Sequence, residues 1–253
     1  MDKMKNGAVL RNGTQRTAKE VFEKYAIVIA FLALLIVVSI LCSSFLTPSN
    51  LILVLNQTSI NGILAVGITY VLITAGIDIS IGSVVGLSGV ISAMVVKAGA
   101  PLPVGFLCGI LAGTLVGVII GILVTKGKLA PYIVTLGFLT IIRGAALLIA
   151  GGRPISSLGD AYGWIGNHNV FGVIPCPVII FLIVVVIGHI ILAHLQIGRY
   201  IYAVGGNSNA AEACGISPNK VKMFVHVFCG TCAGLADPLL PRDYRPPGRR
   251  RGL

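Results

Sequence analysis

The chain has 253 residues, of which 56% are hydrophobic and only 11% carry a charge. A soluble globular domain usually carries about 25% charged residues. The mean hydropathy of +0.96 also leaves more apolar surface than one water-soluble core can bury. The composition therefore excludes an ordinary soluble domain and indicates a protein that works in a membrane.

The net charge of +11 lies mainly at the two ends of the chain and in short loops. Residues 1–25 hold six Lys and Arg, and residues 237–253 hold five Arg. A nucleic-acid site would need basic residues clustered on one folded face, whereas basic loops between apolar runs are typical of membrane proteins. No nucleic acid is expected as a partner.

Several apolar runs have the length of about 20 residues that a helix needs to cross the hydrocarbon core of a bilayer. They cover residues 26–46, 51–74, 79–96, 101–124, 131–150 and 177–195. A seventh run begins near Val221 and stops at about Ala236, which is too short for a full span. We therefore predict an all-α fold, a polytopic transmembrane helix bundle with about six full spans and a truncated seventh.

The distribution of Lys and Arg over the loops predicts the orientation of the spans. With the N-terminus in the cytoplasm, the inside segments hold ten of these residues, and the outside loops hold only Lys97 and Arg153. This asymmetry follows the positive-inside rule. The predicted organisation is a cytoplasmic arm over 1–25, a membrane domain over 26–236, and a basic tail over 237–253.

The inside loop over 196–220 has the pattern of a structured segment. Asn207 or Asn209 can cap a short helix, Gly215 can end it, and Pro218 can begin the next helix. A short helix between two spans is more than a simple connector needs. We therefore expect a docking element on the cytoplasmic side.

Asp78 stands between two apolar runs, where an ionisable side chain is costly and normally faces a cavity, a partner or the interface. It can cap a helix that begins near Ile79, next to Ser80, or it can take part directly in transport. Capping is the favoured interpretation. The two roles are compatible, because a helix start within the membrane can bind a ligand.

The first half of the 51–74 run is unusually polar. It holds Asn56, Gln57, Thr58, Ser59 and Asn61. Gln57 and Asn61 are four residues apart and share one helix face. These groups can line a substrate path or form hydrogen bonds between helices, and both interpretations stay open.

Other polar and sulfur-containing side chains have structural explanations. Arg143 can reach the outer headgroups, and the pair Cys229 and Cys232 is followed by no second pair. Metal-ligand spacing is absent among the three histidines near apolar runs, His189, His194 and His226. With no nucleophile motif, paired carboxylates or phosphate loop, we expect neither an enzyme nor a bound metal or cofactor.

Three stretches of the chain form an ordered set of motifs. They are 67–83 (GITYVLITAGIDISIGS), 131–137 (PYIVTLG) with Arg143-Gly144, and 198–207 (GRYIYAVGGN) continuing through Ala210-Ala211 to Gly215-Ile216. The set resembles the signature of sugar ABC-transporter permeases of the ribose/xylose type. The resemblance covers roughly residues 20–236, in the order and at the spacing of that family.

This resemblance implies one transmembrane subunit of an ATP-binding-cassette importer in the bacterial inner membrane. Such permeases form a homodimer in the lipid, bind an ABC ATPase on the cytoplasmic side, and receive a monosaccharide from a periplasmic sugar-binding protein. The implied ATPase-coupling residues are Arg199, Gly205, Gly206, Asn207, Asn209, Ala210, Ala211, Glu212 and Gly215. The expected substrate-pathway residues are Asn56, Gln57, Asn61, Asp78 and Ser80.

Other membrane functions stay open from the sequence. A permease for branched-chain amino acids or nucleosides would use a related scaffold. A secondary transporter would show inverted repeats and several membrane-embedded acids, whereas Asp78 is the one candidate in this sequence. A structural or assembly protein of the membrane is the remaining alternative, and co-purification of an ATPase would argue against it.

The chain departs from the resembling family after Ala236, where family members continue through several more spans. The tail DPLLPRDYRPPGRRRGL holds five Arg and four Pro. We expect it to be disordered and to result from a frameshift or a disrupted gene, with a natural basic tail as the alternative. Because helix faces would then lack partners, we expect little or no transport by this polypeptide.

The frameshift hypothesis makes a prediction about the DNA downstream of the codon for Ala236. Translation in the other two frames should give further apolar spans of the permease type. If neither frame encodes such spans, the frameshift hypothesis is wrong.

Overall fold

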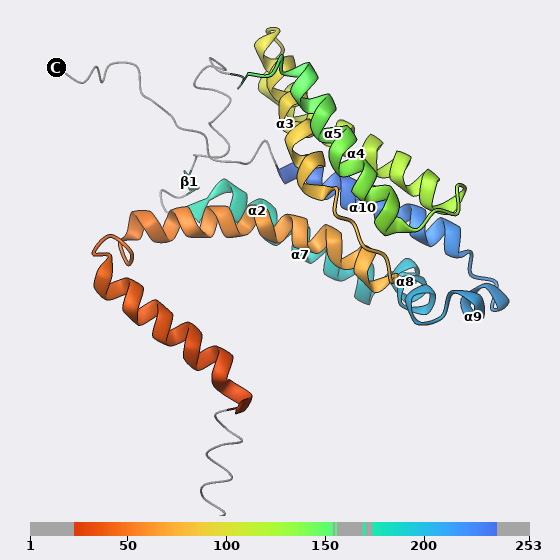
Figure 1. The fold of residues 1–253 in the computed structure, drawn as a ribbon, viewed down its shortest axis with the longest axis horizontal. Helices are drawn as coiled ribbons and strands as arrows, with labels where there is room; N and C mark the ends of the chain where they lie inside the picture. The colour runs from red at the N-terminus through yellow and green to blue at the C-terminus, as the bar shows by residue number, and fades with distance from the viewer. Residues whose placement is uncertain (1–22, 154, 156–168, 171–173, 237–253) are drawn as a thin grey trace, which may run out of the picture. The chain divides into compact units, whose positions relative to one another are not determined.

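The structure, a computed structural model, describes residues 23–153, 155, 169–170 and 174–236. These residues form the expected all-α bundle, with one short hairpin of two strands (Figure 1). The helices are Glu23–Leu41, α2 (Pro48–Ile73), α3 (Ile81–Lys97), α4 (Leu102–Thr125), α5 (Pro131–Ile149), α7 (Cys176–Ala193), α8 (Gln196–Gly206), α9 (Ser208–Ala213) and α10 (Pro218–Ala236). The strands β1 (Asn169–Val170) and β2 (Ile174–Pro175) pair antiparallel.

Among the described residues, five helices are long and apolar enough to cross a membrane. They are Glu23–Leu41, α2, α4, α5 and α7, and they coincide with five of the six apolar runs of the sequence. The sixth run forms α3, which is shorter at 17 residues. The polytopic bundle is thus confirmed, while the number of full spans and the cytoplasmic N-terminus stay predictions.

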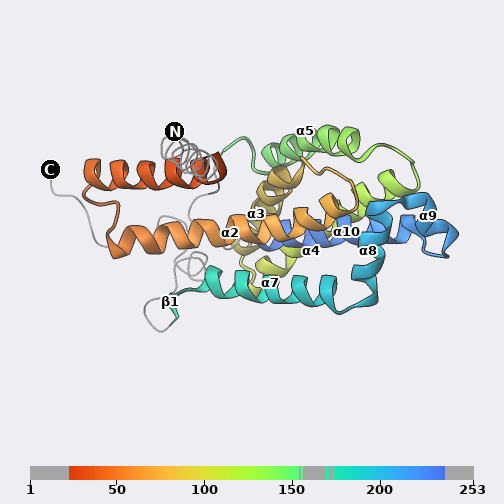
Figure 2. The same cartoon turned by 90° about the horizontal axis from the view of Figure 1, so that it is seen from below.

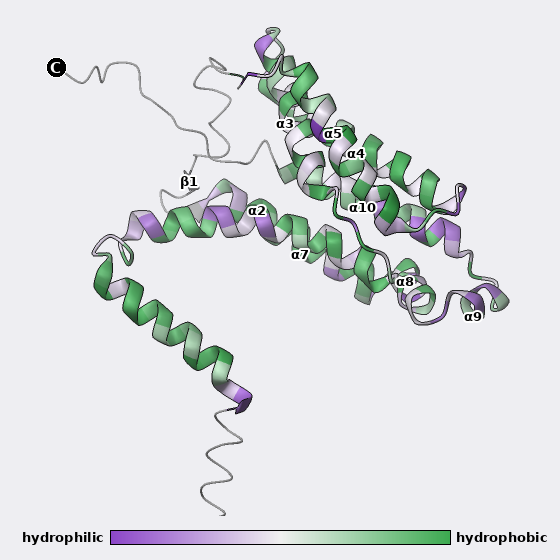
Figure 3. Ribbon diagram, viewed as in Figure 1, coloured by the Kyte–Doolittle hydropathy of each residue, from purple (hydrophilic) through white to green (hydrophobic). Residues whose placement is uncertain are grey.

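The chain divides into two compact units, Met1–Leu53 and Val54–Leu253, and each is described by itself. In the first unit, the apolar window of helix Glu23–Leu41 is 0% buried within the protein. This helix is hydrophobic along almost its whole length (Figure 3). A helix that is apolar on all sides and buries none of its surface is suited to contact with lipid.

The second unit is built around α10, which lies along α4 (Figure 1 and Figure 2). Glycines stand at every fourth position of α4 from Gly105 to Gly121, so they share one face. A Cβ added to Gly113 would lie 2.5 Å from the carbonyl oxygen of Gly230, and one added to Gly117 would lie 2.5 Å from that of His226. The two backbones are therefore in direct contact, as small residues permit between membrane helices.

Large apolar side chains occupy another face of α4. Leu107, Leu111 and Leu115 are each more than half exposed at the surface of the chain. Across the glycine face, the hydroxyls of Thr114 and Thr231 lie 3.0 Å apart and form a hydrogen bond between α4 and α10. The helix thus presents glycine to α10 and leucine to the surroundings, where an apolar surface suits lipid.

All three clusters of buried apolar side chains include residues of α10. Val221, Val225 and Cys229 pack with α2, α8 and α9. Ala233 packs with α3, α4 and α5, and Ala236 packs with α2 and α7. This helix therefore connects the packing of nearly every other helix in the second unit.

The seventh apolar run of the sequence forms this central helix. That this run is a truncated span stays a prediction. The helix α10 begins at Pro218, as predicted, and has 19 residues through Ala236. Its sequence is less apolar than that of the five span candidates because much of its surface contacts other helices and not lipid. Cys229 and Cys232 are buried free thiols in it, which supports the packing role predicted for them.

The contact between α4 and α10 predicts the effect of single methyl groups. Gly117→Ala places its Cβ against backbone atoms of α10 that have no flexible end to move away. We expect this substitution to destabilise the chain by about 1–3 kcal/mol, the usual cost of overpacking. Thermal unfolding in detergent micelles measures the change.

Gly144→Ala in α5 is the matched control, because a Cβ at that position meets no atom within 4 Å. Alanine is the better helix former, so this variant should unfold at the same or a higher temperature. Equal unfolding temperatures for Gly117→Ala and the parent chain would contradict the described helix contact.

Candidate functional site

The chain leaves helical structure between α2 and α3, at the segment that contains Asp78. After Ile73, the amide of Gly76 donates to the carbonyl of Val71 and the amide of Ala75 donates to that of Leu72. This pattern is a Schellman motif, and its left-handed position is held by Ala75 with φ of 58°. Residues 76–79 that follow have no regular secondary structure.

Asp78 does not cap α3, contrary to the favoured prediction. The helix begins at Ile81 and not near Ile79, and the residue at its N-cap position is Ser80. Asp78 Oδ1 instead accepts hydrogen bonds from the backbone amide of Ser80 over 2.9 Å and from its hydroxyl over 2.6 Å. Such a local turn is a common alternative to capping for Asp, and here it fixes the chain just before the helix.

Side chains from two other helices hold this segment in place. The hydroxyl of Thr135 in α5 donates to the carbonyl oxygen of Ile77 over 3.2 Å. The thiol of Cys229 in α10 lies 3.8 Å from Asp78 Oδ2 and donates to it. These contacts hold the non-helical segment against α5 and α10, while the side chains of Ile77 and Ile79 are exposed.

The polar residues of α2 lie on two different faces. Asn56 and Ser59 are buried within the bundle. Gln57 and Asn61 are exposed on a shared face, and Thr69 continues the exposed polar positions two turns further along. The structure thus separates the predicted pathway residues: Asn56 takes part in helix packing, while Gln57 and Asn61 face away from the rest of the chain.

The 196–220 loop contains two short helices. As predicted, Asn207 caps α9, because its side-chain oxygen accepts from the amides of Asn209 and Ala210, both over 3.0 Å. Gly215 ends this helix in the left-handed region, with φ of 84°, which glycine adopts without strain. The expectation of a structured segment is confirmed, and its cytoplasmic position stays a prediction.

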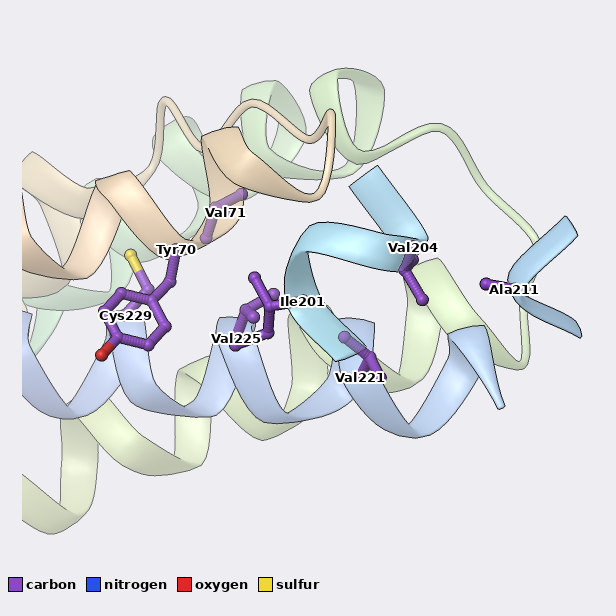
Figure 4. Close-up of a cluster of buried hydrophobic side chains, with 8 residues drawn as sticks. All are labelled: Tyr70, Val71, Ile201, Val204, Ala211, Val221, Val225 and Cys229. Atoms are coloured by element: carbon purple, nitrogen blue, oxygen red, sulfur yellow. The ribbon is translucent and has the colours of Figure 1, made fainter. Parts of the chain in front are cut away.

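A cluster of buried apolar side chains fixes the loop to the bundle (Figure 4). Ile201 and Val204 of α8 and Ala211 of α9 point into this cluster, which also contains Tyr70 of α2. The other side of α9 is exposed, including Asn209 and Glu212. The loop is thus anchored on one side and presents polar side chains on the other.

Gly205 connects this loop directly to the end of α2. A Cβ added there would overlap the carbonyl oxygen of Ile73, the last residue of α2. Only glycine permits this approach. The neighbouring Gly206 is exposed, and a Cβ added there meets nothing within 4 Å.

Tyr70 is a structurally important residue that the sequence interpretation missed. Its hydroxyl donates to the carbonyl oxygen of Gly188 in α7 over 2.6 Å. The centroid of its ring lies 4.4 Å from the ring centroid of Phe228 in α10. A tyrosine in the middle of an apolar run was the available signal, because a buried hydroxyl requires a partner. The same reasoning applies to the fully buried Thr135, which lies within one of the quoted motifs.

Arg143 lines a cavity of about 580 Å³ between α3 and α5, together with Arg153. The predicted contact of Arg143 with the headgroups stays a prediction. Small residues of α3, among them Gly86 and Ala93, leave the space that the two guanidinium groups border. The volume is within the range of small-molecule sites.

Some predictions lie outside the described residues: most of the 1–25 arm, the greater part of the outer loop between α5 and α7, and the tail over 237–253. Within the described ranges, no three His, Cys, Asp or Glu side chains gather as a metal site would require.

Comparison with known proteins identifies the family. Residues 50–242 match the family described as "Branched-chain amino acid transport system / permease component". The chain belongs to this permease family. Membership in a family of transport components confirms that the chain is not an enzyme and, with its apolar helices, that it is a multi-pass protein of the plasma membrane.

Several curated relatives are similar over most of the chain. The ribose import permease protein RbsC of Escherichia coli K12 is 38% identical over 212 residues, which cover 82% of this chain and 66% of that protein. The ribose import permease protein RbsC of Bacillus subtilis 168 is 40% identical over 221 residues, covering 87% and 69%. The D-allose transport system permease protein AlsC of E. coli K12 is 35% identical over 220 residues, covering 85% and 66%.

The chain spans about two thirds of the length of these relatives. No solved structure matches it. The match confirms the resemblance to ribose-type permeases that the three sequence motifs indicate, and those motifs form the α2–α3 segment, the start of α5, and the α8–α9 loop.

The adjacent glycines at 205 and 206 provide a matched pair of variants for this permease. Gly205→Ala should lower stability by about 1–3 kcal/mol and open the α8–α9 loop to protease, because α8 must move away from Ile73. Gly206→Ala should change neither property. Thermal unfolding and limited proteolysis in detergent measure both, and identical behaviour of the two variants would refute the close contact.

Proposed function

We propose that the chain is the permease subunit of an ATP-binding-cassette importer that carries a monosaccharide of the ribose, xylose or allose type. The similarity to ribose and D-allose permeases over 82–87% of the chain is the main support. The polar groups placed by the fold suit a solute that carries many hydroxyl groups. ATP chemistry belongs to a partner ATPase, and this chain supplies the path.

The sugar path follows the exposed polar face of α2. Gln57 and Asn61 present amide groups there, and a buried amide without a hydrogen bond costs roughly 2–7 kcal/mol in an apolar medium. This face therefore suits contact with water, sugar hydroxyls or a second permease subunit better than contact with lipid tails. The proposed homodimer places two such faces at one path.

Two further features suit sugar transport. Asp78 and Ser80 lie where α2 gives way to α3, and broken helices of this kind form substrate sites in other transporters. The guanidinium groups of Arg143 and Arg153 border the 580 Å³ cavity at the end predicted to face outside. Their donors match the hydroxyl oxygens of a sugar, so this cavity is the proposed receiving site from a periplasmic binding protein.

The α8–α9 loop is the proposed coupling element for the ATPase. The exposed side of α9 offers Asn209 and Glu212 to a cytoplasmic partner, and its buried side is fixed by Ala211. A displacement of this loop reaches the substrate path in one step, because Gly205 contacts the carbonyl of Ile73 just before the Asp78 segment. This contact supports a mechanical link between ATPase closure and alternating access.

A branched-chain amino acid is the second candidate substrate, since the family description itself names that class. An aliphatic side chain would require an apolar pocket beside groups that bind its charged ends. The exposed face of α2 offers the amides of Gln57 and Asn61. Two guanidinium groups border the 580 Å³ cavity, whose other lining residues are small or apolar. The similarity to ribose and D-allose permeases is what favours the sugar.

The test is ATP hydrolysis by the reconstituted assembly. The chain is placed in proteoliposomes with the ABC ATPase and binding protein encoded beside it. Ribose, xylose, allose and leucine are then compared as ligands of the binding protein. Because little or no sugar is expected to cross the membrane with this polypeptide, ligand-stimulated hydrolysis and not uptake is the readout. We expect one of the sugars, and not leucine, to raise the hydrolysis rate. Stimulation by leucine alone, or failure of an ATPase to associate with the chain, would contradict the proposal.

Variants on α2 and α4 distinguish an effect on the substrate path from an effect on the stability of the assembly. Asn61→Leu should reduce the sugar-dependent part of the hydrolysis rate while the assembly still forms. Leu111→Val, at the exposed apolar face of α4, is the control and should leave that part unchanged. Equal effects of the two variants would remove α2 from the proposed path.

A further inference from the structure

A second cavity lies at the predicted cytoplasmic end of the bundle, apart from the path along α2. Its volume is about 240 Å³, and its walls come from the turn after α2, the start of α5, the junction of α8 and α9, and the second and third turns of α10. This space exceeds what a single water fills, since one water occupies about 30 Å³ in the liquid. The resemblance places three of its lining residues, Gly205, Gly206 and Asn207, in the coupling loop but implies no ligand for the cavity.

His226 of α10 lines the cavity, with 1% of its surface exposed. Its Nδ1 lies 2.8 Å from the carbonyl oxygen of Lys222 on the same helix. Because a carbonyl can only accept, Nδ1 must donate and carry a proton. The other ring nitrogen, Nε2, has no hydrogen-bond partner among the described residues. A buried polar atom of this kind indicates a missing partner.

The charges around the cavity define the chemistry of that partner. Lys222 also lines the cavity, and among its described lining residues there is no carboxylate. Ser208 and Asn207 add a hydroxyl and an amide to the lining. Three kinds of donor with an uncompensated positive charge attract an anion.

A phosphate group matches both requirements at once. A phosphate monoester has a second pKa of about 6, so it retains one O–H in part of its population at neutral pH. It can therefore donate to a neutral Nε2, or accept from a protonated one, while its other oxygens accept from Lys222 and Ser208. A chloride ion cannot donate, and a bare sugar has no charge to pair with Lys222.

We propose that this cavity binds a phosphate group, either inorganic phosphate, a small phosphate ester or the headgroup of a phosphomonoester lipid. The walls include residues 74–76 on one side and 205–208 on the other. A bound phosphate would join the coupling loop to the turn that precedes Asp78. If the proposed transport function holds, occupancy slows transport by holding these two elements together. The binding itself does not depend on that function.

The test measures binding by the full chain in phosphatidylcholine nanodiscs. Inorganic phosphate and a pentose phosphate are titrated at constant ionic strength against chloride, and the thermal unfolding temperature is recorded. We expect a saturable rise with the phosphate compounds and none with chloride. Lys222→Met should weaken the apparent affinity about tenfold or more, the effect of losing a hydrogen bond to a charged group.

Lys220→Met is the matched control, because Lys220 is exposed on the same helix turn and does not line the cavity. It should leave the affinity unchanged. His226→Phe should weaken binding as Lys222→Met does; if this buried substitution prevents folding, the partly buried Lys222 position still decides the outcome.

A second arm distinguishes the sources of phosphate. Nanodiscs that contain phosphatidic acid should abolish the response to soluble phosphate if a lipid headgroup fills the cavity, and should preserve it if a soluble ligand does. Either result supports the site. The absence of a saturable response in both kinds of nanodisc, or equal loss in the Lys222 and Lys220 variants, would overturn the proposal. Loss of transport without loss of binding would count only against the proposed transport function.

Discussion

The direct backbone contact between α4 and α10 is the constraint on which the second unit depends. Carbonyl oxygens of α10 lie where the Cβ atoms of Gly113 and Gly117 would be, so the helices can approach only because side chains are absent there. This approach places α10 where its other faces reach α2, α3, α7 and α8. The arrangement of the candidate site follows from it, since α10 contributes Cys229 beside Asp78 and His226 beneath the coupling loop.

A second close contact, between Gly205 and the carbonyl of Ile73, determines how the coupling loop relates to the substrate path. The turn at residues 74–76 lies between the two and has Ala75 in the left-handed region, where a residue with a Cβ is strained. The Asp78 segment that follows has few hydrogen bonds of its own and depends on Thr135 and Cys229. Because side chains hold the Asp78 segment and helical backbone hydrogen bonds do not, this segment can move at modest cost. The close glycine contacts, of Gly205 with Ile73 and of α4 with α10, cannot slide without a steric clash.

The sequence predicted local features well, because their signals are local. Apolar length predicted the helices, Asn207 and Gly215 predicted the limits of α9, and the motifs predicted the family.

The failures concern contacts between distant residues. Asp78 was expected to cap a helix because Asp is a good cap, but the position of α3 is set by its packing, and Ser80 stands at its start. The central position of α10 could not be predicted, because hydropathy reports suitability for lipid and not contact with other helices. The glycine spacing of α4 was visible in the sequence, although its partner was not.

The environment of α2 can be argued from its two faces. Asn56 and Ser59 are buried, and the Ser59 hydroxyl donates to the carbonyl oxygen of Leu55 in the same helix, so Ser59 needs no aqueous path. Gln57 and Asn61 lie on the surface of the chain, and leaving two amides against lipid tails would cost several kcal/mol. Contact with lipid is therefore disfavoured at this face of α2, whereas it is suitable at the leucine face of α4. The two helices have opposite requirements: α4 needs lipid, and α2 needs water or a polar partner. That asymmetry, more than the count of apolar residues, indicates which side of the bundle belongs to a transport path.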